Sequence, residues 1–323
     1  MISSICIEGL IYGIMVLGLF CSFRVLNFCD MTIDGSFPMG ACVLAICITN
    51  GIPVFLAIIL AFMAGIIAGL VTSLIYTKLH IPDLLAGILT MTMLYSINLR
   101  IMANRANISF LRTPHLFKNI ISFSENHFPS IDSSITLVIF MVIIVFAIKK
   151  LMDLFFHTDM GLTMGALGAN PQLVISQGVN PAILRTIGIC FGNGMAAVAG
   201  SFYAMYQGFA DVSMGTGTVV SGLASLMLGE FIIRSNKIGL QTLRVIIGSI
   251  IYRALMILAR TYGHYIHLTP NDLKLVTGIL IIICLIITRL APEKKSGFRF
   301  FKKSRKQSDV CAEEKKTESG EEK

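Results

Sequence analysis

Long apolar runs separated by short polar stretches dominate the chain. Several runs approach or exceed the roughly 20 residues that cross a bilayer as a helix, so the pattern predicts about nine membrane-spanning helices. Their expected ranges are 7–26, 36–50, 53–77, 84–102, 135–153, 181–207, 219–233, 240–261 and 272–290. We therefore expect an all-α polytopic membrane domain over residues 1–291. A tail over 292–323, rich in Lys, Glu and Ser, is expected to be disordered.

The composition supports an integral membrane protein. Of the 323 residues, 55% are hydrophobic and 14% are charged, whereas soluble domains carry roughly a quarter charged residues. Residues 1–8 contain an acidic residue and no Lys or Arg. The first apolar run therefore lacks the basic region of a cleaved signal peptide, and we expect it to remain in the mature protein.

The basic residues predict an orientation. The cluster KKSGFRFFKKSRK at 294–306 directly follows the last apolar run. Such a cluster favours the cytoplasmic face and anionic lipid headgroups, and explains the net charge of +8 without a nucleic-acid partner. Alternation of spans then places Lys78, Lys149 and Lys237 on the cytoplasmic side, with the N-terminus outside and the C-terminus inside. The basic residues of the loop 103–134 count against this arrangement.

Two short patterns concern how the helices are arranged. PDLLAGIL at 82–89 is similar to NDLKLVTGIL at 271–280, and the two would open spanning helices from opposite sides of the membrane. An inverted repeat would produce this pairing. Gly65 with Gly69, and Gly188 with Gly192, have the four-residue spacing that lets helices pack closely in lipid, and the alternative is that they line a pathway.

Residues 160–181, MGLTMGALGANPQLVISQGVNP, are an uncharged interruption between two apolar halves. Asn170 suits a helix N-cap, Pro171 suits the first helical position, and Gly178 suits the left-handed residue past a helix end. These signals predict a helix of about two turns outside the bilayer, within 168–179. Its apolar residues need a partner surface or the headgroup layer, so it either docks to another protein or lies on the membrane.

Asp30 and Asp34 flank the turn between the first two spans. Carboxylates at membrane depth are costly and usually face a cavity or a partner. Either Asp34 or Ser36 caps the second span, or this broken segment lines a substrate path. The two interpretations are compatible because a capped helix start can itself point at a ligand.

Three further charged residues lie in the apolar runs of the C-terminal half. Glu230 and Arg244 are expected at similar depth on adjacent antiparallel helices, which predicts an ion pair, with substrate contact as the alternative. Arg253 has no obvious sequence partner. It would bind a substrate carboxylate, snorkel to the interface, or pair with an acidic residue that the sequence does not reveal. A set of apolar residues is expected in helix packing, with contacts in a pathway as the alternative: Phe37, Met39, Met91, Met93, Tyr203 and Tyr206.

Several functional motifs are missing from the sequence. No GxxxxGK[ST] phosphate loop occurs, so the chain is not expected to hydrolyse ATP alone. No HExxH, GxSxG or clustered His/Cys set occurs, which counts against a membrane protease or esterase. We expect a chain that is not an enzyme and binds no cofactor or metal.

The stretch GALGANPQLVISQGVNPAILRTIGICFGNGMAAVAGSFYA resembles a segment of the branched-chain amino acid and ribose-type permeases of ABC transporters. In that family a coupling helix of the form A-x-N-P-x-x-A-x-x-x-G-I-N leads into a span rich in small residues. Asn170, Pro171, Gly178 and Asn180 match the pattern, and Val174 replaces its alanine. FRVLNFCDMTIDGSFPMGA, GLASLMLGE and TPNDLKLVTGIL look like a branch that includes predicted tryptophan-type importers.

The resemblance implies a permease subunit of an importer in the bacterial plasma membrane, which moves a small organic solute. Aromatic or branched-chain amino acids are the expected class, although relatives of the same fold move sugars and nucleosides. The implied partners are a separate ATPase subunit, an extracytoplasmic binding protein and a second permease subunit, expected to form a homodimer. The alternative is an ion- or proton-coupled secondary transporter that uses intramembrane charges.

The resemblance and the charge pattern give two sets of candidate site residues. The residues expected to couple to the ATPase are Gly168, Asn170, Pro171, Leu173, Val174, Gly178 and Asn180. The residues considered for a substrate path are Asp30, Asp34, Ser36, Phe37, Glu230 and Arg253.

Overall fold

The computed structural model describes residues 2–111, 113, 116–127, 132–233 and 237–262, and the single positions 275, 278, 279, 282 and 286. The expected ninth span and the second copy of the repeat lie outside the described residues, apart from those single positions. The polar tail with its basic cluster also lies outside them.

Eight helices coincide with the first eight predicted spans. They are α1 (Ile2–Leu19), which continues as the π-helical segment η1 (Phe20–Val25), α2 (Ile33–Thr49), α3 (Val54–Leu79), α4 (Asp83–Ile101), α6 (Ser133–Phe156), α9 (Pro181–Gln207), α10 (Thr218–Ile232) and α11 (Ile238–Tyr262). Six of these spans are long and apolar enough to cross a membrane, whereas α2 and α10 are shorter. The chain is thus a mostly helical polytopic membrane protein.

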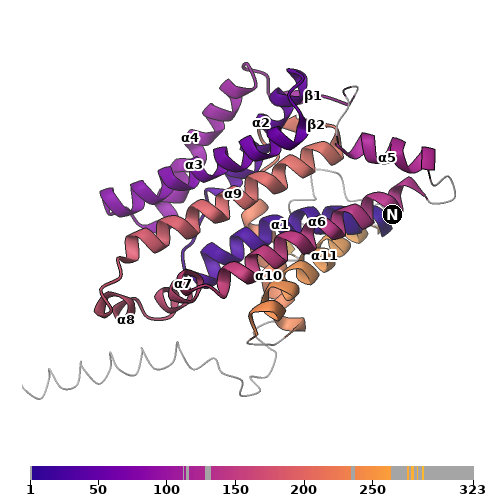
Figure 1. The fold of residues 1–323 in the computed structure, drawn as a ribbon. Coiled ribbons are helices and arrows are strands. Elements are labelled where there is room, and N and C mark those ends of the chain that lie inside the picture. The colour runs from indigo at the N-terminus through magenta and orange to yellow at the C-terminus, as the bar shows by residue number, and fades with distance from the viewer. Residues whose placement is uncertain are drawn as a thin grey trace, which may run out of the picture. The chain divides into compact units, whose positions relative to one another are not determined.

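Small elements lie at opposite ends of the helix bundle (Figure 1). At one end, which we call the strand end, β1 (Asn107–Ser109) pairs antiparallel with β2 (Phe209–Asp211). The helix α5 (Leu116–His127) and the N-terminus also lie toward this end. At the other end, which we call the α8 end, lie α7 (Asp159–Ala169) and α8 (Pro171–Ser176).

The helix α9 is central to the packing and contacts α1, α2 and α3. The buried stripe of α3 consists of Ala, Gly, Thr and Ser residues, which lets its backbone approach α9. A Cβ atom on Gly65 would lie 2.5 Å from the backbone oxygen of Asn193, and one on Gly69 would lie 2.8 Å from Cα of Cys190. The close packing predicted for these glycines is therefore confirmed.

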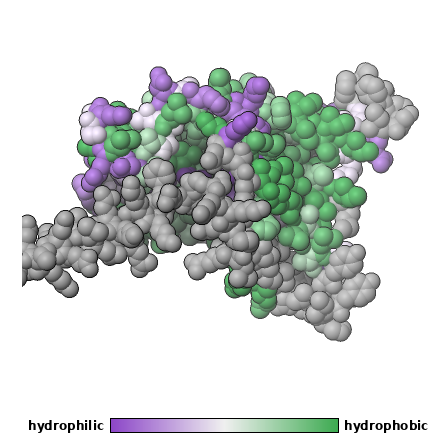
Figure 2. All heavy atoms as spheres, turned by 90° about the horizontal axis from the view of Figure 1, so that it is seen from below, coloured by the Kyte–Doolittle hydropathy of each residue, from purple (hydrophilic) through white to green (hydrophobic). Residues whose placement is uncertain are grey.

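Large apolar side chains cover the outer faces of α3, α4 and α6. Phe55 is 78% exposed and Ile143 is 62% exposed. On the face drawn in Figure 2, hydrophobic residues gather at the right of the picture and hydrophilic ones at its upper left and along the top. Such an apolar surface is far larger than soluble monomers expose, and suits contact with lipid.

Candidate functional site: a polar layer within the bundle and a capped helix at its end

The starts of α2 and α10 meet inside the bundle. The Asp34 carboxylate, in the first turn of α2, accepts hydrogen bonds from the backbone N–H groups of Gly217 (2.9 Å) and Val219 (2.7 Å). It also accepts one from the Thr218 hydroxyl at 2.8 Å. Because the first N–H groups of a helix have no partner within it, Asp34 satisfies the N-terminus of α10.

This contact corrects the predicted cap of the second span. Thr32 is the N-cap residue of α2 and makes no side-chain capping bond, so neither Asp34 nor Ser36 caps that helix. Asp34 caps α10 instead, 184 residues away at Thr218. The prediction considered only the helix that follows Asp34 in sequence, whereas its partner comes from a remote segment.

A second polar contact set joins the same region to α9. Asn193, midway along α9, donates to the Asp30 carboxylate at 2.7 Å, and the Ser36 hydroxyl donates to the Asn193 side-chain oxygen at 2.6 Å. The backbone N–H of Thr32 donates to the other oxygen of Asp30 at 2.9 Å. Asp30, Ser36 and Asn193 are all buried. The structure thus brings Asp30, Asp34 and Ser36 together, and adds Asn193, which the sequence analysis did not select.

Glu230 makes the predicted ion pair. Its carboxylate lies 2.9 Å from Nη2 of Arg244 on α11. It also lies 2.9 Å from Nε of Arg24 in η1, a contact that the sequence did not predict. Glu230 therefore joins three segments.

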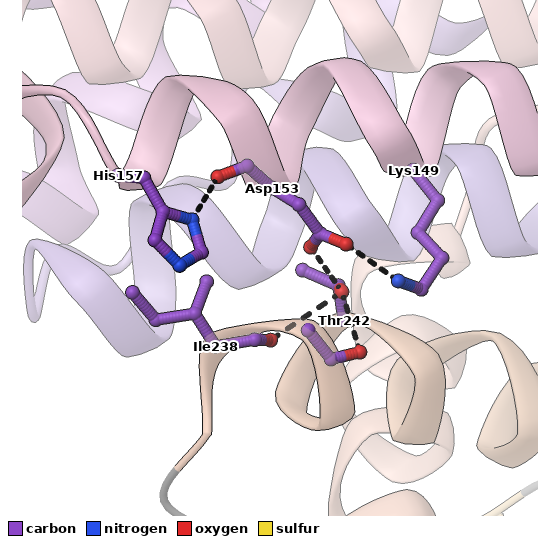
Figure 3. A network of polar contacts seen from close by, with 6 residues as sticks. Lys149, Asp153, His157, Ile238 and Thr242 are labelled. Atoms are coloured by element: carbon purple, nitrogen blue, oxygen red, sulfur yellow. Dashed lines mark hydrogen bonds and ion pairs between the residues drawn. The ribbon is translucent and has the colours of Figure 1, made fainter.

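Asp153 makes a comparable connection near the α8 end (Figure 3). Its carboxylate accepts hydrogen bonds from Nζ of Lys149 at 2.5 Å and from the Thr242 hydroxyl at 2.6 Å. The bond to Thr242 joins α6 to α11. The backbone oxygen of Asp153 lies 2.6 Å from Nδ1 of His157. These contacts hold the last turns of α6, which lead into α7.

Arg253 lies far from Glu230, because it is nine residues beyond Arg244 on α11, about 13 Å along the axis. Its acidic neighbour is Glu8, with Nη1 and Oε2 3.6 Å apart. Its guanidinium carbon lies 3.2 Å from the centre of the Tyr12 ring. Phe37, which is fully buried, packs against the same ring. The partner that the sequence did not reveal is thus on α1.

The predicted short helix at the α8 end has the expected caps. The Asn170 side chain accepts a hydrogen bond from the Gln172 N–H at 3.1 Å, and Pro171 is the first residue of α8. Gly178 has φ +79°, the left-handed conformation. Asn180 caps the following span by accepting from the Ala182 N–H at 2.9 Å.

The remainder of the uncharged stretch 160–181 differs from the prediction. Residues 159–169 form a separate helix, α7, whose N-cap Thr158 accepts a hydrogen bond from the Gly161 N–H at 3.3 Å. Gly168 belongs to α7, and a Cβ atom there would collide with the backbone oxygen of Val25. The expected helix over 168–179 is therefore two helices separated at Asn170.

The short helix has one buried and two exposed apolar side chains. Val174 is completely buried and holds α8 on the bundle. Leu173 is 48% exposed and Ile175 is 55% exposed. Exposed apolar side chains on a capped helix suit contact with another surface.

Comparisons with known proteins agree with this architecture. Residues 1–285 match the family described as the branched-chain amino acid transport system permease component. The chain is 36% identical over 281 residues to the tyrosine transport system permease protein of Clostridioides difficile (strain R20291), covering 87% of this chain and 89% of that protein. It is 34% identical over 278 residues to an uncharacterised protein of Rickettsia prowazekii (strain Madrid E), covering 86% and 94% respectively.

A solved structure shares the fold. PsaBC from Streptococcus pneumoniae, in complex with Fab, contains a chain that aligns with a TM-score of 0.50 and 12% identity. The alignment covers 87% of this chain and 89% of that chain. The family match extends over nearly all of the membrane domain, and both the family and the relative named for a function are described as transport permeases. The chain therefore belongs to the permease components of branched-chain amino acid transport systems, as a multi-pass ABC transporter permease of the bacterial plasma membrane.

Proposed function

We propose that the chain is the membrane subunit of an importer that moves an amino acid with ATP hydrolysed by a separate subunit. The observation that carries this proposal is α8, a helix capped at both ends whose Leu173 and Ile175 side chains are exposed. ATP-driven closure of the ATPase dimer would push on such a helix. Val174, buried against the bundle, would transmit that movement to the spans.

Aromatic amino acids are the proposed substrates, with branched-chain amino acids as the next class. The relative in Clostridioides difficile is named a tyrosine transport permease, and it is similar to this chain over most of both lengths. An extracytoplasmic binding protein would deliver the solute. A second copy of the permease would complete the path, since the importer mechanism needs two permease subunits.

The proposed orientation puts the α8 end in the cytoplasm and the N-terminus outside. Lys78 is in the last turn of α3, and Arg185 is near the start of α9, both at the α8 end. Basic residues near the ends of spans favour the cytoplasmic side. With a ninth span at 272–290, the C-terminus would also be cytoplasmic.

An exchange at α8 tests the coupling role. We would reconstitute the permease with its ATPase and binding protein in liposomes, and measure ATP-dependent uptake of labelled L-tyrosine. Leu173→Asp should abolish uptake and ATPase binding while the chain still inserts and folds. Gln172→Asp is the matched control, because Gln172 is an exposed neighbour on the same helix and gains the same charge. It should retain uptake.

Two results would overturn the proposal. Normal uptake by Leu173→Asp would show that α8 does not dock an ATPase through its apolar residues. Uptake that collapses with a protonophore and ignores ATP would instead support the secondary transporter. The Asp34 and Glu230 carboxylates make close contacts with other residues, which gives that alternative little support.

A further inference from the structure

Five side chains from four helices meet on the half of the bundle toward the strand end. We call this set the aromatic–charge cluster: Glu8 and Tyr12 of α1, Phe37 of α2, Tyr203 of α9 and Arg253 of α11. The ring centres of Tyr12, Phe37 and Tyr203 lie 5.3 to 5.7 Å apart. Packing at these distances makes one continuous aromatic surface.

The charged part of the cluster is loosely paired. Arg253 and Glu8 approach to only 3.6 Å, which is longer than a hydrogen bond, whereas Arg244 and Glu230 lie 2.9 Å apart. Nε of Arg253 is buried and has no hydrogen-bond acceptor within the part of the chain that the structure describes. Buried polar atoms usually have a partner, so this Nε–H is an unused donor on a guanidinium whose carbon lies over the Tyr12 ring, 3.2 Å from its centre.

The two charged side chains are partly exposed, whereas the rings beneath them, which we call the aromatic floor, are more deeply buried at Tyr12 and Phe37. The side chains of Glu8 and Arg253 are each 15% exposed. Tyr12 is 6% exposed and Phe37 is fully buried. Charged residues within membrane-spanning helices rarely face lipid, and they commonly mark a substrate path or a partner. The cluster therefore combines an opposite pair of partly exposed charges with aromatic rings packed beside and beneath them.

We propose that the aromatic–charge cluster binds the transported amino acid as a zwitterion with an aromatic side chain. Arg253 would bind the α-carboxylate, Glu8 would bind the α-ammonium group, and the substrate ring would pack on Tyr203. This assignment rests on the proposed import of amino acids, and it names the residues that select the substrate. The Gln207 amide, which donates to the Tyr203 hydroxyl at 3.1 Å, orients that ring.

The chemistry of the ligand matches the chemistry of the cluster. A zwitterion inserted between Arg253 and Glu8 gives each charge an opposite charge, so the site stays neutral with and without substrate. A guanidinium can hold a carboxylate through two parallel hydrogen bonds. A site that hydrogen-bonds both the α-carboxylate and the α-ammonium group of its substrate binds analogues that lack one of these groups much more weakly. The aromatic floor would favour tyrosine or phenylalanine over leucine.

The competing interpretation is that Glu8 and Arg253 only fasten α1 to α11. A charge exchange separates the two interpretations. In Glu8→Arg with Arg253→Glu, the ion pair is restored in reverse, so a purely structural pair regains its function. A substrate site regains its fold, but its charges then oppose those of the substrate in the bound orientation.

The test uses the complete permease–ATPase complex in nanodiscs and equilibrium binding of labelled L-tyrosine. Arg253→Gln and Glu8→Gln should each weaken binding about tenfold or more, the size expected for one charged hydrogen bond. The exchanged pair should recover the melting temperature of the wild type but not its tyrosine binding. Tyramine, which lacks the carboxylate, should bind the wild type weakly and should not be weakened further by Arg253→Gln.

Substitution of the aromatic floor tests the side-chain preference. Tyr203→Leu should lower the preference for tyrosine over leucine several-fold. Tyr206→Leu is the matched control, because Tyr206 lies one turn further on α9 and outside the cluster. It should leave the preference unchanged.

The possible failures are distinguishable. If the wild type takes up tyrosine with ATP but the exchanged pair binds tyrosine normally, the pair is structural and only this inference is overturned. The same holds if the single variants bind as the wild type does. If the wild-type complex carries neither tyrosine, phenylalanine nor leucine, the proposed function itself is wrong, and the inference is wrong with it.

Discussion

The carboxylate of Asp34 accepts a 2.7 Å hydrogen bond from the backbone N–H of Val219, which joins the first turn of α2 to the first turn of α10. Two helices remote in sequence thus share one polar side chain at their starts. The first N–H groups of a helix have no partner within it, so the α10 N-terminus depends on this carboxylate. A movement of α2 would therefore displace the N-terminus of α10 directly.

Replacement of Asp34 should destabilise the chain. Asp34→Ala removes the acceptor for the α10 start and should lower the free energy of unfolding by about 1–2 kcal/mol, as for other lost caps. Asp34→Asn keeps one acceptor oxygen and should cost less. Thermal unfolding of the purified chain measures both. Asp132→Asn is the control, since Asp132 precedes α6 without a capping bond. Equal melting temperatures for Asp34→Ala and the control would contradict the cap.

Asn193 should be more sensitive than Ser36. Asn193→Ala leaves the buried Asp30 carboxylate without one of its donors, and should cost about 3 kcal/mol of unfolding free energy. Ser36→Ala keeps that bond and should cost about 1 kcal/mol. The Ser36 hydroxyl and the Asp30 carboxylate both bond to Asn193. Ser36→Ala should therefore add little further loss of stability once Asn193 has been replaced by alanine. Unfolding measured for the four variants of this cycle tests the coupling, and strictly additive costs would refute it.

The two arginines that contact Glu230 should differ in importance. The side chain of Arg244 is 8% exposed and that of Arg24 is 33% exposed. Arg244→Gln should cost about 3 kcal/mol, because it leaves a poorly hydrated carboxylate with one partner fewer. Arg24→Gln should cost about 1 kcal/mol, because solvent screens the exposed pair. Thermal unfolding of each variant decides the order. The exchange Glu230→Arg with Arg244→Glu should recover much of the loss, and equal costs for both arginines would contradict this ranking.

The positions of the helices could be predicted because their signals are local. An apolar run of sufficient length fixes a span, and Asn180 with Pro181 marks the start of α9 at the predicted residue. The caps of α8 were likewise readable from Asn170, Pro171 and Gly178. In each case the residues that form the feature lie within one or two helical turns of one another.

The partners of the buried polar side chains could not be predicted, because they come from remote segments. Asp34 and Thr218 are 184 residues apart, and Asp30 and Asn193 are 163 apart. Hydropathy places each residue at a depth but does not say which helices are neighbours. Helix α7 was not predicted, for a different reason. Its glycines and uncharged residues suggest a loop, whereas Thr158 and packing on η1 allow a helix.

Two glycines near α8 should respond oppositely to alanine, although a Cβ atom on either would meet no atom within 4 Å. Gly178 has φ +79°, so Gly178→Ala should strain the turn after α8 by about 1 kcal/mol. Gly165 is inside α7, where Gly165→Ala should stabilise the helix by about 0.5–1 kcal/mol. Amide hydrogen exchange measures both effects locally. Exchange should become faster in α8 for the first variant and slower in α7 for the second. Because steric space is equal at the two sites, equal responses would mean that the backbone conformation at Gly178 does not set the end of the helix.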